Sequence, residues 1–199
     1  MKYDPNIHRR RSIRLKGYDY SQAGWYFITI CTHNRLCLFG GVQNGEMVLN
    51  DAGMMVQTVW NEIPPHYPEI ATDEFIIMPN HVHGIIIVGA GPRACPDMVN
   101  CETGPRACPN QANHETGTGQ PRGVAPTLSL PDIIHRFKTM TTKRYTDGVQ
   151  QHGWMPFPGK LWQRNYYEHI IRDEKSHNRI SEYIQTNPLR WRDDKYYED

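Results

Sequence analysis

Two histidines separated by a single residue, His81 and His83, stand at the start of the apolar run Ile85 to Val88. This β-branched run predicts a short buried strand, and alternate side chains of a strand point to the same face. The two imidazoles would then lie side by side, an arrangement that suits a pair of metal ligands. The alternative is a pair of histidines on the solvated face of a strand end, because this spacing alone is a weak signal.

A tyrosine and an amide lie four residues apart near the C-terminus, in a helix expected over residues 173–187. Tyr183 and Asn187 share one edge of this helix. Asn187 can offer its carbonyl oxygen to a metal held by the two histidines, and Tyr183 would then place its hydroxyl beside that metal. The alternative is structural: Asn187 ends the helix before Pro188, and Tyr183 packs at its edge.

Strands and helices are expected to alternate irregularly around these residues. Strands are predicted at 25–32, 74–78, 81–88 and 162–171, and a hairpin over 38–50 that turns at Asn44-Gly45. A first helix is expected from a cap at Asp51 to a stop at Pro64-Pro65. A second helix is expected from a capping box at Ser129 to about Tyr145, and a third over 173–187. This order favours an α+β sandwich with an antiparallel sheet over a doubly wound parallel sheet.

The composition bounds the class of protein. A chain of 199 residues with 38% hydrophobic and 22% charged residues suits one globular domain, 1–199. No apolar run reaches transmembrane length, and the basic N-terminus lacks the apolar core of a secretory signal. The five cysteines form no C-x-x-C pair, which indicates free thiols. We therefore expect a cytoplasmic protein that does not bind membranes.

Basic residues gather in two places, although the net charge of the chain is only +1. Residues 1–16 hold six basic residues and one acidic residue, a net charge of +5, and such an arm can contact phosphates or remain a solvated tail. One side of the helix after Ser129 is basic as well. The candidate DNA contacts are Arg9, Arg10, Arg11, Arg14, Arg136, Lys138, Lys143 and Arg144.

A tandem repeat interrupts the domain: GPRACPDMVNCET (91–103) is followed by GPRACPNQANHET (104–116). Pro, Gly, Asn and Thr dominate it and leave almost nothing apolar to bury, so we expect residues 90–127 to form a disordered insert. Its cysteines and histidine do not indicate zinc, because their spacing follows from the duplication.

Three segments together resemble one known family. HVHGIIIV (81–88), preceded by a strand and MPN, resembles the HUH motif, two histidines flanking a bulky hydrophobe. LWQRNYYEHIIRDE (161–174), EYIQTNPLRW (182–191) and the helix IIHRFKTMTTKRY (133–145) resemble the corresponding parts of REP-associated tyrosine transposases. The resemblance covers nearly the whole chain except the insert and both ends.

This resemblance implies a ferredoxin-like fold and a metal-dependent transposase of single-stranded, REP-like hairpin DNA in the bacterial nucleoid. By motif position, Tyr183 would be the nucleophile that forms a 5′-phosphotyrosine, and His81, His83 and Asn187 would hold Mg²⁺ or Mn²⁺. The related insertion-sequence transposases are dimers, whereas the REP-associated branch need not be, so both a homodimer and a monomer remain open.

Three alternatives stay open at this point. Tyr166 and Tyr167 compete with Tyr183 as nucleophiles, but they lie on a strand-like segment with no amide four residues on. The protein could be a hairpin-DNA-binding protein that no longer cleaves. It could also be a metal hydrolase that uses the two histidines, although such sites usually recruit further His and Asp ligands.

Overall fold

The computed structural model describes residues 15, 17–89 and 128–197. Most of the basic arm, including its four arginines, and the whole insert 90–127 lie outside these residues, so the expectations for them are not addressed by the structure. None of the helices in the described part of the chain combines the length and the apolar character that a membrane span requires.

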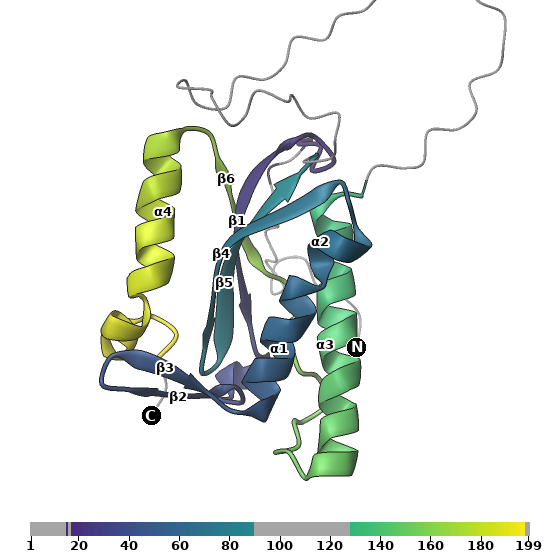
Figure 1. Cartoon of the computed structure of the whole chain (residues 1–199), viewed down its shortest axis with the longest axis vertical. Coiled ribbons are helices and arrows are strands. Elements are labelled where there is room, and N and C mark those ends of the chain that lie inside the picture. The colour runs from purple at the N-terminus through teal and green to yellow at the C-terminus, as the bar shows by residue number, and fades with distance from the viewer. Residues whose placement is uncertain (1–14, 16, 90–127, 198–199) are drawn as a thin grey trace, which may run out of the picture.

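A four-stranded antiparallel sheet forms the centre of the fold (Figure 1), with the strand order β4-β5-β1-β6. The strands are β1 (Gly24–Cys31), β4 (Ile70–Met78), β5 (His81–Val88) and β6 (Tyr167–Ile171). Helices α1 (Asp51–Asn61) and α3 (Leu130–His152) cover one face, and α4 (Glu174–Thr186) covers the other. This order, with α1 between β1 and β4 and α3 between β5 and β6, is a ferredoxin-like arrangement and confirms the expected α+β fold.

A hairpin of β2 (Gly40–Gln43) and β3 (Glu46–Leu49) precedes α1, with the turn at the expected place. Asn44 and Gly45 both have positive φ, 54° and 81°, as a type I′ turn requires. The helix cap was predicted wrongly: the side chain of Asn50, one residue before Asp51, accepts a hydrogen bond of 2.9 Å from Gly53 N–H.

The expected helix stop at Pro64-Pro65 is also wrong. Helix α1 ends at Asn61, and the prolines lie in the first turn of the short helix α2 (Ile63–His66). Proline is tolerated there because the first N–H groups of a helix have no partner within the helix. Proline therefore marks a new helix here rather than the end of the old one.

Helix α3 begins with the expected capping box of Ser129 and Asp132. It continues well beyond Tyr145 to His152 and is capped by Gly153, whose φ of +67° suits a left-handed helix cap. Strand β6 is shorter than expected, because Trp162 forms only an isolated bridge with Thr32. The 3-10 helices η1 (His33–Arg35) and η2 (Pro188–Asp193) complete the described elements.

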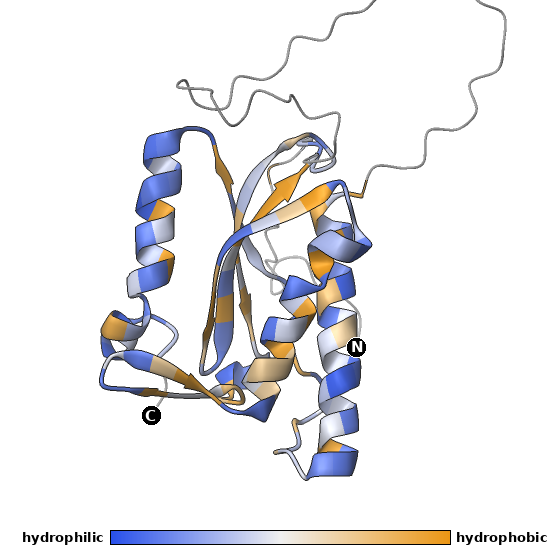
Figure 2. Ribbon diagram, in the orientation of Figure 1, coloured by the Kyte–Doolittle hydropathy of each residue, from blue (hydrophilic) through white to orange (hydrophobic). Residues whose placement is uncertain are grey.

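The two faces of the sheet carry separate cores. The larger core lies under α1 and α3 and includes the fully buried Tyr26, Trp60 and Phe137. The smaller core consists of Phe27, Ile85, Ile171, Ile180 and Ile184 and fastens α4 to the sheet. Figure 2 shows α4 polar over most of its surface, with apolar residues toward the sheet. The helix that carries Tyr183 therefore docks through a narrow apolar stripe.

The two ends of strand β5 differ in what they carry. It begins with His81 and ends at Val88, and the chain re-enters the described fold at Leu128, just before α3. The connection between β5 and α3 thus leaves the sheet at the end opposite His81.

Gly84, the residue after His83, allows Trp60 to lie against β5 on the face opposite the histidines. A Cβ at Gly84 would lie 2.7 Å from Trp60 Cη2 and 2.9 Å from Phe75 Cδ2, two rings that stack with centroids 4.1 Å apart. We expect Gly84→Ala to lower the free energy of unfolding by about 1–3 kcal/mol, the usual cost of overpacking a core. Urea denaturation measures this. Gly41→Ala in β2 is the matched control, because its Cβ would meet nothing within 4 Å. Equal losses in both variants would contradict this account of Gly84.

Candidate metal and tyrosine site

The two histidines lie side by side on β5, on the face that α4 covers. His81 and His83 are 0% and 1% exposed, and their Nε2 atoms are 3.0 Å apart. The other ring nitrogen of each histidine has a separate partner. His81 Nδ1 lies 2.8 Å from Asn80 Oδ1, and His83 Nδ1 lies 2.8 Å from Thr29 Oγ1. Both Nε2 atoms are thus directed at one shared point.

Asn80 fixes the proton position on His81. The Asn80 side chain donates from Nδ2 to the backbone carbonyl of Tyr196 at 2.7 Å, so its Oδ1 faces the imidazole and accepts from Nδ1–H. The neutral ring then has its lone pair on Nε2. Metal-binding histidines characteristically donate their second N–H in this way.

Both imidazoles are neutral near pH 7. Burial lowers the pKa of His81 well below its ordinary value, and the positive charge of a protonated His83 would lower it further. Burial, followed by the positive charge of Lys195, lowers the pKa of His83 to about 3. Neutral imidazoles are the form that binds metal ions.

Asp194 joins the pair, although no sequence pattern indicated it. One ligand atom each from His81, His83 and Asp194 can be chosen so that all lie within 4.8 Å of one another. Asn187 Nδ2 donates to Asp194 Oδ2 at 3.3 Å, so Asn187 orients this carboxylate. Only the position of Asp194, seven residues after Asn187, could have suggested it, because no periodic pattern extends beyond Pro188.

The donor atoms at this site fit a divalent cation. Two nitrogens bound to one ion at about 2.1 Å each can lie no more than about 4.2 Å apart, which the separation of 3.0 Å satisfies. Asn187 is 2% exposed, and its Oδ1 has no hydrogen-bond partner among the described residues. A buried carbonyl oxygen without a partner costs about 1–3 kcal/mol, and a cation would remove that cost.

Tyr183 lies beside the histidines on α4. Its hydroxyl oxygen is 3.3 Å from His83 Nε2. Burial, followed by the negative charge of Asp194, raises the pKa of Tyr183, while a hydrogen bond with Asn187 lowers it. The side chain is therefore a neutral phenol near pH 7. Removing its proton requires a nearby positive charge.

Contacts at both ends of α4 fix the position of Tyr183. His177 Nε2 lies 2.6 Å from Asp73 Oδ2, and Gln185 Nε2 donates to Glu74 Oε1 at 2.8 Å. Both acidic residues belong to β4. Between these contacts, Ile180 and Ile184 enter the smaller core. The helix is thus held on both sides of the tyrosine.

The competing tyrosines take different places. Tyr166 is buried in the larger core on the opposite face of the sheet, with Lys138 Nζ 5.5 Å from its ring centroid. Tyr167 lies on the α4 face, 44% exposed, with its ring centroid 6.2 Å from that of Phe27. Of the three tyrosines, Tyr183 alone has a hydrogen bond to His83 among the described contacts.

The basic residues of α3 do not join this site. Arg144 forms two hydrogen bonds with Glu62, of 3.0 and 2.7 Å. Lys138 donates to the backbone carbonyl of Gln163 at 2.8 Å, and Arg136 lies over the ring of Tyr67. Lys143 is exposed. All four belong to the helix layer on the other face of the sheet (Figure 1), so any contact they make with DNA is separate from Tyr183.

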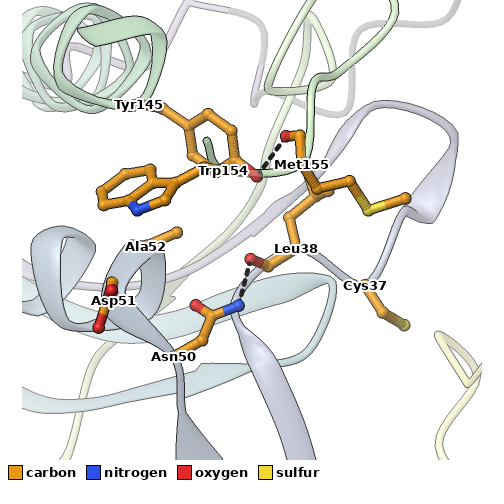
Figure 3. A pocket seen from close by; sticks show the side chains of 8 residues that line it. All are labelled: Cys37, Leu38, Asn50, Asp51, Ala52, Tyr145, Trp154 and Met155. Carbon is orange, nitrogen blue, oxygen red and sulfur yellow. Dashed lines mark hydrogen bonds between the residues drawn. The ribbon is translucent and has the colours of Figure 1, made fainter. Parts of the chain in front are cut away.

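A further pocket of about 270 Å³ lies between the start of α1 and the end of α3 (Figure 3). Two of its polar side chains already have partners: Asn50 donates to the carbonyl of Leu38 at 3.0 Å, and the Tyr145 hydroxyl donates to the carbonyl of Met155 at 2.9 Å. In contrast to the histidine site, its lining brings together no group of possible metal ligands.

Comparisons with known proteins identify one close relative. An uncharacterized protein of Haemophilus influenzae is 43% identical over 202 residues, which cover 100% of this chain and 98% of that protein. No family model matches the chain. Among solved structures, a REP-associated tyrosine transposase bound to a REP hairpin has a TM-score of 0.49 and 15% identity, covering 90% of this chain and 74% of that one. A proposed transposase from Deinococcus radiodurans has a TM-score of 0.43 and 15% identity, covering 87% and 96%.

Proposed function

We propose that this chain, which belongs to the same family as the uncharacterized Haemophilus influenzae protein, is a metal-dependent endonuclease and strand transferase of single-stranded DNA that acts at hairpins. The observation that carries this proposal is the Tyr183 hydroxyl 3.3 Å from His83 Nε2, within a buried pair of histidines. The resemblance to REP-associated tyrosine transposases points independently to Tyr183, His81 and His83.

His81, His83, Asp194 and the carbonyl oxygen of Asn187 would hold the divalent ion, which we propose to be Mg²⁺ or Mn²⁺. The carboxylate and amide oxygens suit both ions, and the imidazoles favour Mn²⁺. Such an ion supplies electrostatic stabilisation, because it withdraws charge from a phosphate oxygen and favours the phenolate over the phenol.

Tyr183 is the nucleophile of the proposed reaction. Its hydroxyl oxygen attacks the phosphorus atom of a DNA phosphodiester, and the phenol proton passes to solvent. A bond forms between this oxygen and phosphorus, while the bond from phosphorus to the 3′ oxygen breaks. The departing 3′ oxygen takes up a proton and becomes a free hydroxyl. The 5′ end of the DNA remains attached to the protein as a phosphotyrosine.

The covalent link conserves the free energy of the broken phosphodiester. Another 3′-hydroxyl can therefore attack the phosphotyrosine, restore the Tyr183 hydroxyl and join two DNA strands without ATP. The fixed position of α4 supports both cleavage and joining, because it holds the Tyr183 oxygen beside the cation site before the substrate arrives. Cleavage followed by such joining is DNA transposition.

A covalent-adduct assay tests the proposal. The full chain is incubated with Mg²⁺ or Mn²⁺ and a labelled single-stranded oligonucleotide that carries a hairpin from the genome that encodes it, with short flanks. We expect an adduct that survives SDS, carries the DNA 5′ end and does not form with EDTA. Hairpin binding without any adduct would instead support a DNA-binding protein that does not cleave.

The N-terminal arm is proposed to add affinity through phosphate contacts. Removing residues 1–16 should weaken hairpin binding and reduce its salt dependence, because each lost contact lowers the log–log salt slope on duplex DNA by about 0.9. Fluorescence anisotropy over a salt series measures this. A full-length variant with Gln in place of Arg9, Arg10, Arg11 and Arg14 separates charge from length. A slope that does not change in either variant would show that the arm does not contact DNA.

A further inference from the structure

A groove continues from Tyr183 toward the edge strand β6, between α4, the sheet and the residues after η2. We call it the flank groove and define it by Phe27, Tyr167, Arg179, Tyr183, Arg190 and Lys195, which line it with neighbouring residues. Its volume of about 550 Å³ lies within the range of about 300–1,000 Å³ for small-ligand pockets. It is therefore large enough for part of a DNA strand.

Tyr167 presents an exposed ring in this groove. Its ring meets Phe27 edge to face at 6.2 Å between centroids, and Phe27 in turn stacks on His83 at 5.5 Å with an interplanar angle of 27°. The row of rings thus begins at the cation site and ends at a side chain that is 44% exposed. Exposed aromatic rings beside a basic surface are the stacking platforms of single-strand-binding proteins.

Basic side chains border this ring. Arg179 lies four residues before Tyr183 on α4 and therefore on the same side of the helix. Arg190 lies beyond the end of α4, and Lys195 Nζ is 5.7 Å from the Tyr167 ring centroid. Asp193 and Asp194 also line the groove. Within the described residues, no salt bridge joins a carboxylate to Arg179 or Arg190, and both side chains are exposed.

We propose that the flank groove binds the nucleotide next to the scissile phosphate. Tyr167 stacks on its base, and Arg179 and Arg190 bind its phosphodiester, since guanidinium groups match phosphate oxygens in geometry and charge. This inference rests on the proposed function and adds to it a binding site for one flanking nucleotide. Stacking tolerates any base, so Tyr167 provides affinity and position, while sequence recognition comes from other residues.

The test measures hairpin binding by full-length Tyr183→Phe protein, which binds DNA without reacting. A labelled hairpin oligonucleotide with single-stranded flanks is compared with a series that carries one abasic nucleotide at each flanking position. Adding Tyr167→Ala should weaken binding of the intact DNA about 5- to 150-fold, as expected for the loss of one base stack. Tyr167→Phe keeps the ring and should restore the affinity.

The abasic series identifies the nucleotide. At one flanking position, removing the base should weaken DNA binding by the protein that keeps Tyr167. The same abasic DNA should bind the Tyr167→Ala variant as well as intact DNA does, because that variant has already lost the stacking ring. Arg179→Ala should reduce the salt slope more than Lys160→Ala, which removes an equal charge from an exposed residue outside the groove.

The test distinguishes failure of the groove proposal from failure of the proposed function. If wild-type protein forms the DNA adduct but Tyr167→Ala neither weakens binding nor removes any abasic effect, the groove proposal is wrong and the proposed function stands. If wild-type protein neither binds the hairpin nor forms an adduct with it, both proposals fail.

Discussion

We expect Tyr183→Phe to abolish the proposed covalent DNA adduct, with a loss of at least about 10³-fold, because it removes only the oxygen proposed to attack phosphorus. The substitution leaves the ring in contact with Phe27 and His83. It deletes one hydroxyl whose contact with His83 is 3.3 Å long, so stability should change by no more than about 1 kcal/mol. SDS gel electrophoresis of the labelled adduct measures the effect, and thermal unfolding with hairpin binding verifies the fold.

Tyr166→Phe is the matched control. It removes the same atom from a tyrosine buried on the opposite face of the sheet, and the adduct should form as in wild type. An adduct that persists in Tyr183→Phe but disappears in Tyr166→Phe or Tyr167→Phe would show that the nucleophile has been assigned to the wrong residue.

Removal of the proposed cation ligands is expected to have an effect of similar size. Losing a residue that only orients a metal ligand typically costs about 10- to 100-fold in metal affinity, so Asn80→Ala should weaken Mn²⁺ binding by about that factor. His81→Ala, His83→Ala and Asp194→Asn remove donor atoms directly and should weaken binding further. Asn187→Ala should do less, because water can replace one amide oxygen. Isothermal titration with Mn²⁺ measures these affinities without DNA.

Glu182→Gln is the control for Asp194→Asn, since it removes one exposed carboxylate from the residue next to Tyr183. Its Mn²⁺ affinity should equal that of wild type. In parallel, adduct formation should fall in the same order as metal affinity across the variants. Wild-type protein that forms the adduct in the presence of EDTA would overturn the metal-dependent mechanism.

The architecture was predictable because its elements depend on local signals. The apolar run after His83, the Asn44-Gly45 turn and the Ser129 capping box each determine structure within a few residues, and all three formed as expected. Boundaries were less predictable. Asn50 and Asp51 are both good cap residues, and only the packed helix decides between them.

That the two histidines share one face of a strand was predictable from strand periodicity. Helix periodicity placed Tyr183 and Asn187 on one edge of a helix, but only the family resemblance directed that edge toward the histidines. Asp194 was not predictable, since the chain after Pro188 has no periodic pattern and returns to β5 through tertiary contacts alone. The bond from Asn80 Nδ2 to the carbonyl of Tyr196 joins residues 116 positions apart, and such contacts cannot be read from spacing. The same limit applies to α3, where sequence shows a basic side but not that Arg144 pairs with Glu62.

The direction of β5 has an evolutionary consequence. Its eight residues, at about 3.3 Å per residue, place the exit toward α3 roughly 23 Å along the strand from His81. A change of chain length at that exit alters neither the spacing of the histidines nor the segment from β6 to Asp194. We therefore expect duplications at this exit, such as the tandem copies at 91–103 and 104–116, to be tolerated by the candidate site. The same junction is a suitable position for inserting a reporter domain.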